Sequence, residues 1–234
     1  MNLNSKWTLA MLLTLTVSVA GCAKKNEESV ANNASTGTAS AETSAPSKAA
    51  PVRSTAENSA ANDEKAAAIQ AALAEDEIVS DPRGQWASSA TASSTYASDK
   101  APTAKTSYAA NAATGAPDVE RYGDNGNAWT TETPDKGIEW LEVKFDKPVA
   151  ATEIRIRQSY GPGAIIKVDL LSEDGARHMV WQGLDDQQYP SSTIAWFNRQ
   201  FQKTSYPVTG ARITLATNAV SGWNEIDAVQ LLGD

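Results

Sequence analysis

Cysteine and histidine are almost absent from this sequence. Its 234 residues contain one cysteine, Cys22, and one histidine, His178. A single cysteine cannot form a disulfide within the chain, so any folded core must be held by packing alone. The same scarcity excludes a zinc site built from several histidine or cysteine ligands.

Positive charge is also scarce. The sequence has 20 Lys and Arg against 28 Asp and Glu, which gives a formal net charge of −8. It has no stripe of basic residues interleaved with aromatic ones, the pattern that neutralises the phosphates of nucleic acids. The charge pattern therefore argues against a nucleic-acid partner.

Long apolar runs are lacking, with one exception near the start of the chain. Residues 7–19 are apolar apart from threonine and serine, and Lys6 precedes them. About a dozen apolar residues are too few for a membrane span, which needs roughly 20, but they are typical of the hydrophobic region of a signal peptide. The sequence therefore predicts a signal peptide over residues 1–21.

The end of this segment, from Ser18 to Cys22, resembles the bacterial lipobox. The resemblance implies a diacylglyceryl thioether on Cys22, cleavage before it and acylation of the new amino terminus. Two or more acyl chains anchor a protein stably to membrane lipid. The chain would then be a lipoprotein of the cell envelope, and Ala23 after the cysteine favours the outer membrane. The alternative is an ordinary signal peptide in which Cys22 is incidental.

Residues 22–83 differ in composition from residues 84–234. Small and polar residues dominate the earlier segment and aromatic residues are absent from it. Such a segment cannot bury enough apolar surface to offset its ordering entropy, which predicts a flexible tether. Within it, a capping Asn62, early acidic residues and a run of alanines predict a short helix near residues 62–77. Whether that helix packs on the domain after it stays open.

From residue 84 the hydrophobic pattern has a period of two. Leu141, Val143 and Phe145 share one face of a run, and turn-forming residues separate this run from the others. Residues 173–175 predict a hairpin. Short alternating runs without a long helical pattern predict an all-β fold, an antiparallel β-sandwich over residues 84–234. Three tryptophans within the runs are expected in the core: Trp129, Trp140 and Trp181.

Four segments resemble a known superfamily. They are ATGAPD at 113–118, YGDNGNAWT at 122–130, EWLEVKFDKPV at 139–149 and GWNEIDAVQL at 222–231. Together they resemble galactose-binding-like jelly-roll domains, the superfamily of discoidin and coagulation-factor C-type domains and of many bacterial carbohydrate-binding modules. The resemblance implies a jelly-roll sandwich and says little about the ligand, because this fold carries many functions.

The same resemblance implies a structural calcium site. Domains of this superfamily often hold calcium in the loop that corresponds to residues 111–130, and Asp118 and Glu225 match the positions of their acidic ligands. Calcium takes six to eight oxygen ligands from carboxylates and loop carbonyls. The alternative is that Asp118 caps a turn and Glu225 accepts hydrogen bonds from loop amides.

The sequence offers little for catalysis. His178 lies in a predicted hairpin strand, where a surface role is commoner than that of a general base. Paired acidic residues fall in turns, where they are expected on conformational grounds. We therefore expect a protein that is not an enzyme.

Aromatic and basic residues in or beside predicted loops are candidates for a sugar site. Sugar rings stack on exposed aromatic side chains while polar groups bind the hydroxyls. The candidate ligand-binding residues are Arg121, Tyr122, Tyr160, Trp196, Arg199 and Trp223. The alternative for each aromatic residue is structural packing.

These observations together predict a non-enzymatic, membrane-anchored lipoprotein. It would present a β-sandwich binding module to carbohydrate of the envelope or the extracellular space. A lipoprotein that binds an envelope protein, without binding glycan, is the alternative. An accessory subunit of an enzyme complex is a third interpretation.

Overall fold

The computed structural model describes residues 55–97 and 106–234. The predicted signal peptide, the acylated Cys22 and the tether as far as residue 54 lie outside the described residues. Within the described ranges, no helix has the length and apolar character needed to cross a membrane.

The elements follow one another as a helix and nine strands, with two short 3-10 helices. They are α1 (Thr55–Val79), β1 (Gly84–Trp86), β2 (Ser89–Ala92), η1 (Ala110–Ala113), β3 (Ile138–Val149), β4 (Ala151–Tyr160), β5 (Ile165–Ser172), β6 (Arg177–Gln182), β7 (Ala195–Gln200), β8 (Val208–Ala216), η2 (Thr217–Ala219) and β9 (Glu225–Gly233).

The helix α1 is longer than the short helix predicted near residues 62–77. It begins at Thr55 and ends at Val79, because the residues before 62 include alanines and a glutamate that favour a helix near its N-terminus. Ile69 and Leu73 are exposed on it. Its last turn contacts the sandwich: the Glu75 carboxylate lies 2.6 Å from the Arg157 guanidinium.

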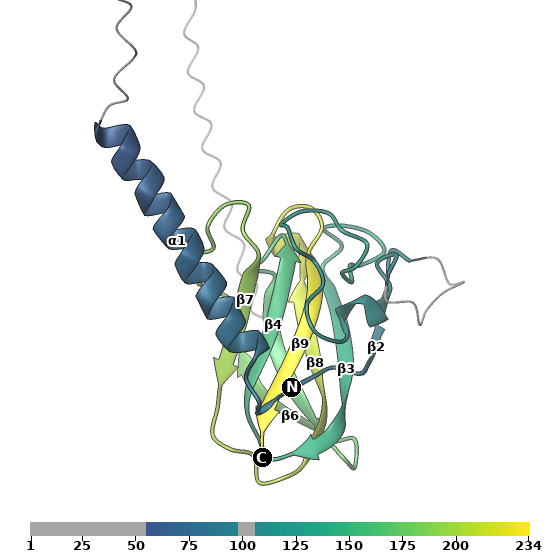
Figure 1. Cartoon of the computed structure of the whole chain (residues 1–234). Coiled ribbons are helices and arrows are strands. Elements are labelled where there is room, and N and C mark those ends of the chain that lie inside the picture. The colour runs from purple at the N-terminus through teal and green to yellow at the C-terminus, as the bar shows by residue number, and fades with distance from the viewer. Residues whose placement is uncertain (1–54, 98–105) are drawn as a thin grey trace, which may run out of the picture. The chain divides into compact units, whose positions relative to one another are not determined.

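The nine strands form two antiparallel sheets. The four-stranded sheet has the order β1-β9-β4-β7 and the five-stranded sheet the order β2-β3-β8-β5-β6, and they face each other in Figure 1. The predicted all-β antiparallel sandwich is therefore confirmed. The predicted hairpin also forms, between β5 and β6, with Gly175 at a positive φ of 80°.

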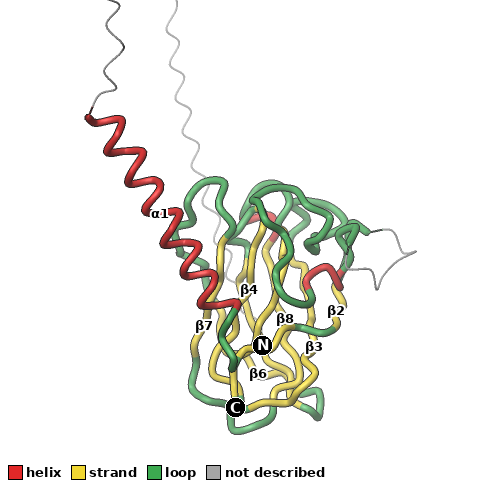
Figure 2. Tube along the Cα trace, viewed as in Figure 1, coloured by secondary structure: helices red, strands yellow, loops and turns green. Residues whose placement is uncertain are grey.

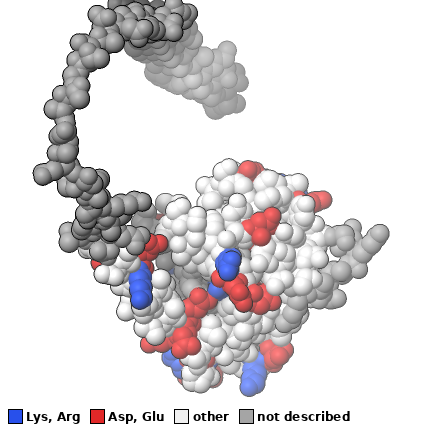
Figure 3. Space-filling model, turned by 45° about the horizontal axis from the view of Figure 1, so that its top comes forward, with Lys and Arg blue, Asp and Glu red and all other residues white. Residues whose placement is uncertain are grey.

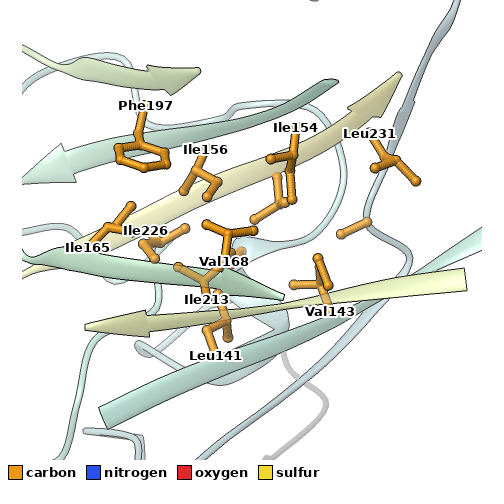
Figure 4. Packing of buried hydrophobic residues seen from close by; sticks show 14 of the residues in the cluster. Leu141, Val143, Ile154, Ile156, Ile165, Val168, Phe197, Ile213, Ile226 and Leu231 are labelled. Carbon is orange, nitrogen blue, oxygen red and sulfur yellow. The ribbon is translucent and has the colours of Figure 1, made fainter. Parts of the chain in front are cut away.

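The core lies between the sheets and follows the period-two pattern. Leu141 and Val143 from β3 and Ile154 and Ile156 from β4 point into the core that the two sheets enclose, as Figure 4 shows. Trp129, predicted in the core, is fully buried. Burial of each such side chain contributes about 1.5–3 kcal/mol to the free energy of unfolding.

Trp140 is not in the core, contrary to the prediction. It pairs with Thr214 across β3 and β8, on the outer face of the five-stranded sheet, where the Arg212 guanidinium lies 3.7 Å from its ring centre. Neighbouring residues of a strand point to opposite faces, so the inward position of Leu141 turns Trp140 outward. Trp181 does face inward, with its ring centre 4.9 Å from that of Phe197.

Several long loops meet at one end of the sandwich. Tyr160 at the end of β4 pairs with Glu225 at the start of β9, and Gln158 pairs with Ala195 at the start of β7. The loops that lead out of or into these strand ends therefore lie together, at the end away from the C-terminus in Figure 2. The β5–β6 hairpin turn lies at the opposite end.

Candidate functional site

The loop end of the sandwich carries a cleft of about 280 Å³, which we call the tyrosine cleft. Four segments build it: the loop between η1 and β3, the β4–β5 turn, the β6–β7 loop and the segment before β9. Its lining residues are Tyr122, Tyr160, Gly161, Pro162, Tyr189, Pro190, Ser191, Ser192, Val220, Ser221 and Trp223.

Two tyrosines form one wall of the tyrosine cleft. The rings of Tyr122 and Tyr160 meet edge to face with centres 5.3 Å apart. Gly161 follows Tyr160 with a positive φ of 53°, and a β-carbon placed there would lie 2.3 Å from the carbonyl oxygen of Trp223. This close approach requires glycine, and it fixes the β4–β5 turn against the segment before β9.

A hydrogen-bonded network positions Tyr189 in the cleft. The Tyr189 hydroxyl donates a 2.5 Å hydrogen bond to Asp185 Oδ2, and the Arg199 guanidinium lies 3.4 Å from Asp185 Oδ1. Asp185 is buried. Burial, followed by the hydrogen bond to Asp185, raises the pKa of Tyr189 above its usual value. Tyr189 therefore remains uncharged at neutral pH, and its bond to Asp185, which is paired with Arg199 on β7, fixes its position in the cleft.

A second, smaller cavity adjoins the cleft, and we call it the acidic cavity. It has a volume of about 90 Å³ and is lined by Tyr96, Tyr108, Asp124, Thr130, Trp223 and Glu225. Trp223 lines both cavities. The Tyr96 ring contacts Tyr108 and Trp223 edge to face, with centres 5.2 and 5.3 Å apart.

Glu225 is the buried carboxylate of the acidic cavity. Its Oε2 accepts a 3.2 Å hydrogen bond from the backbone N–H of Asn125, whereas its buried Oε1 has no hydrogen-bond partner within the described part of the chain. Burial raises the pKa of Glu225 to about 8, and the charge of Asp124 adds to this shift. Asp124 Oδ1 accepts a 2.6 Å hydrogen bond from the Tyr108 hydroxyl.

Asp118, predicted with Glu225 as a calcium ligand, lies in another cluster. It is exposed, and its backbone N–H donates a 3.4 Å hydrogen bond to Asp227, which is paired with Arg157. The acidic neighbour of Glu225 is Asp124. Across residues 55–97 and 106–234, no group of three or more His, Cys, Asp or Glu side chains is placed to hold a metal.

The acidic cavity nevertheless passes a test of fit for a hard cation. Glu225 Oε1 is buried without a hydrogen-bond partner in the described residues, and a cation beside it would stabilise the charged form of a carboxyl group whose pKa burial raises. Ser159 Oγ is also buried without a hydrogen-bond partner in the described residues. Asp124 and Glu225, rather than Asp118 and Glu225, are the carboxylates that fit calcium, with loop oxygens completing the shell.

The structure brings together three of the six predicted ligand-binding residues. Tyr122, Tyr160 and Trp223 all line the tyrosine cleft. Arg121 is exposed beside Tyr122 in the sequence and does not line the cleft. Arg199 supports the cleft from strand β7 through Asp185.

Trp196, expected in or beside a loop, follows the β6–β7 loop and does not line the tyrosine cleft. It lies on β7, pairs with Arg157 of β4 and points to the outer face of the four-stranded sheet. There its ring centre lies 6.5 Å from that of Trp86. Residues 195–200 form a strand because Ala195 and Phe197 alternate into the core.

Sequence reasoning missed Tyr189 as a cleft residue. The signal was present, because Tyr189 precedes Pro190 and two serines, a composition typical of an exposed loop. Nothing in the local sequence indicates Asp185 as its partner.

The histidine takes part in a small polar cluster at the opposite end of the sandwich. Ser172 Oγ lies 3.0 Å from His178 Nε2 and donates a 2.5 Å hydrogen bond to Asp174 Oδ1. The aspartate therefore binds the serine and does not orient the histidine ring, which stacks on Tyr206 with centres 3.8 Å apart. This arrangement differs from a nucleophile–base–acid triad and stabilises the hairpin turn.

A family model described as pappalysin-1, SD scarf domain, C-terminal, matches residues 78–234. The chain belongs to this family. The scarf-domain match starts in the last turn of α1 and spans every strand of the sandwich, so both cavities lie inside it. No curated protein sequence matches the chain.

The scarf domain is also similar to solved structures of low sequence identity. Chitosan-binding module 1 of a chitosanase/glucanase from Paenibacillus sp. IK-5 is 11% identical, with a TM-score of 0.43, over 62% of this chain and 94% of that chain. The lectin domain of lectinolysin, solved with Lewis b antigen, is 17% identical, with a TM-score of 0.42, over 62% and 92%. An F5/8 type C domain from Bacteroides fragilis is 18% identical, with a TM-score of 0.43, over 65% and 98%.

Proposed function

We propose that the protein is a non-enzymatic carbohydrate-binding module and that the tyrosine cleft is its sugar site. One observation carries the proposal: four aromatic residues, together with serines, line a cleft of about 280 Å³. Aromatic faces stack on the apolar C–H face of a sugar, and hydroxyls exchange hydrogen bonds with its edge. The volume is near the lower end of the usual range for ligand sites, which suits a single bound sugar residue of a longer chain.

The test is a glycan screen with the chain that lacks the signal peptide and carries Cys22→Ser. Binding to envelope and extracellular polysaccharides would be followed by calorimetry. Tyr160→Ala should weaken binding about tenfold, because it removes a stacking surface worth roughly 1 kcal/mol beyond its buried area. Tyr206→Ala, at the opposite end, is the matched control. No binding across neutral polysaccharides, acidic polysaccharides and peptidoglycan would reject the proposal.

We also propose that the module is anchored by lipid. The lipobox-like sequence ending at Cys22 supports this, and Ala23 after the cysteine favours the outer membrane as the site of attachment. Two or more acyl chains give stable attachment. Mass spectrometry of the mature protein should show an acylated Cys22 as the first residue. An unmodified thiol and a different amino terminus would contradict it.

Calcium is proposed as a structural ion of the acidic cavity. Glu225 and Asp124 would bind it through carboxylate oxygens, and its charge would offset the buried, unpartnered Oε1 of Glu225. The ion would hold the loop around residue 124 against the start of β9. We propose a supporting role for the fold, without a part in ligand chemistry.

A protein-binding function would use a different surface. A groove of about 410 Å³ on the five-stranded sheet is lined by Ile138, Ile166, Lys167, Gln182, Gly183 and Thr214. Ile138 is 66% exposed there, and Met179 and Leu184 are also exposed. If the glycan screen is negative, cross-linking of the anchored protein in whole cells tests this alternative, with Ile138→Lys as the variant expected to lose the partner.

A further inference from the structure

The tyrosine cleft differs from its surroundings in charge. Apart from the phenols of its three tyrosines, none of its described lining residues carries an ionisable side chain. Its polar groups are hydroxyls and backbone atoms. A ligand in this cleft would therefore meet no cationic side chain among the residues that line it.

Acidic residues border the cleft. Asp185 lies beside Tyr189 and accepts a 2.5 Å hydrogen bond from its hydroxyl, but the Arg199 guanidinium, 3.4 Å away, offsets its charge. Asp135 accepts a 2.9 Å hydrogen bond from the backbone N–H of Gly222, beside the lining residue Ser221. Behind Trp223 lies the acidic cavity, with Asp124 and Glu225. Figure 3 shows the loop end brought forward, with acidic side chains more widespread than basic ones.

Two of the three basic residues near the cleft are paired with acidic residues. Arg199 is bound to Asp185, and its guanidinium lies 3.7 Å from the ring centre of Phe197. Lys136 lies 3.6 Å from the Glu139 carboxylate. Arg121 is exposed and stands outside the lining residues. None of these three cations is placed by the structure to face a ligand in the cleft.

We propose that the tyrosine cleft selects uncharged sugar residues and rejects those that carry a carboxylate or a sulfate. The inference rests on the proposed carbohydrate function and specifies its ligand class. An anionic group that enters the cleft loses water without gaining a charged partner. It also approaches the carboxylates of Asp124 and Asp135, which carry charge of the same sign, and such like-charge contacts weaken binding strongly.

Matched sugars test the inference directly. Oligomers of galactose, glucose and mannose are compared by calorimetry with the corresponding uronic acid oligomers, which differ from them at C6 alone. We expect every bound neutral oligomer to bind at least about tenfold more tightly than its uronate, and the difference to narrow as salt screens the bordering charges. Equal or tighter binding of the uronate overturns the inference and leaves the proposed function intact. Failure of both members of every pair, together with no binding in the full glycan screen, rejects the proposed function and the inference with it.

A gain-of-function variant gives a second readout that does not depend on loss of folding. Ser221→Lys places a cation at the rim of the cleft, and Ser221→Gln is the neutral control of similar size. The lysine should raise uronate affinity at least about fivefold more than the glutamine does.

Arg121→Ala should leave the ratio of neutral to uronate affinity unchanged. A larger ratio in this variant would show that Arg121 binds anionic ligands, which contradicts the inference. The measurements are made with calcium and with EDTA, because a bound ion would neutralise Asp124 and Glu225 but leave Asp135 charged.

Discussion

The Tyr189 hydroxyl donates a 2.5 Å hydrogen bond to the buried Asp185, and this contact joins the β6–β7 loop to the cleft. Asp185 is in turn paired with Arg199 on β7. The position of one cleft ring therefore depends on a charged pair below it. Asp185 and Arg199 therefore shape the tyrosine cleft, whereas Tyr189 lines it and would contact a ligand.

Asp185→Ala should reduce both stability and ligand binding. It leaves Arg199 and the Tyr189 hydroxyl without their partner, at a cost of about 2 kcal/mol in the free energy of unfolding. Tyr189→Phe keeps the ring and the Asp185–Arg199 pair, so it should change glycan affinity less than Asp185→Ala does. Urea unfolding and calorimetry measure the two effects. A larger loss of affinity in Tyr189→Phe would show that the hydroxyl itself contacts the ligand.

Calcium should raise the melting temperature, and EDTA should lower it, by a few degrees. Asp124→Asn and Glu225→Gln should abolish this difference, because they remove the carboxylates that face the acidic cavity. Asp118→Asn should preserve it. If Asp118→Asn abolishes the calcium effect and Asp124→Asn preserves it, Asp118 is the ligand. If the melting curves of the unmutated protein with calcium and with EDTA are identical, it binds no structural calcium.

Gly161→Ala should be strongly destabilising. The new β-carbon would meet the Trp223 carbonyl oxygen at 2.3 Å, in a backbone conformation with φ of 53° that side chains disfavour. We expect a loss of more than about 2 kcal/mol, together with weaker glycan binding. Gly175→Ala is the control, since its φ is 80° but its β-carbon would meet open space. It should cost about 1 kcal/mol and leave binding unchanged.

Removal of the two acidic partners of Arg157 should have unequal effects. The Asp227 side chain is fully buried beside it, whereas the Glu75 side chain on α1 is 37% exposed. Asp227→Asn should cost about 3 kcal/mol, because it breaks a buried ion pair. Glu75→Gln should cost less than about 1 kcal/mol. Chemical unfolding of both variants measures the difference, and equal losses would mean that α1 contributes as much as the buried pair.

Acid should weaken the contact between the end of α1 and the sandwich. The hydrogen bond from Arg83, with the charges of Arg83 and Arg155, lowers the pKa of Asp81 from 3.8 to about 2. A lowered carboxyl pKa stabilises the fold above the unfolded value, and this stabilisation is lost as the pH falls through the folded value. The unfolding free energy of Asp81→Asn should therefore decrease less between pH 4 and pH 2 than that of the unmutated protein. Asp63 is exposed, so the unfolding free energy of Asp63→Asn should depend on pH as that of the unmutated protein does.

The sequence predicted the sandwich well because strand geometry is local. Alternation at Leu141, Val143 and Phe145 indicates which face of β3 is buried, whatever its neighbours are. The same rule, applied strictly, would have placed Trp140 outside. Trp196 shows the limit of the approach, since a strand that begins after a long loop has no local mark of its start.

The aromatic residues of the candidate site could be predicted from the sequence, but their polar neighbours could not. Tyr122, Tyr160 and Trp223 stand out as aromatic residues in loops, and the topology brings those loops to one end. Two residues that are far apart in the sequence but in contact in the fold cannot be recognised from the residues around either one. Asp124 and Glu225 are about a hundred residues apart, and local sequence cannot distinguish Asp124 from Asp118 as the acidic neighbour.

Trp223 lines both the tyrosine cleft and the acidic cavity. An ion on one side and a sugar on the other would each perturb the same fluorophore. Titration of either one in the presence of the other would then measure any free-energy coupling between them, which must be equal in both directions. The difference in emission between the chain that lacks the signal peptide and its Trp223→Phe variant would isolate Trp223 from the other five tryptophans that remain.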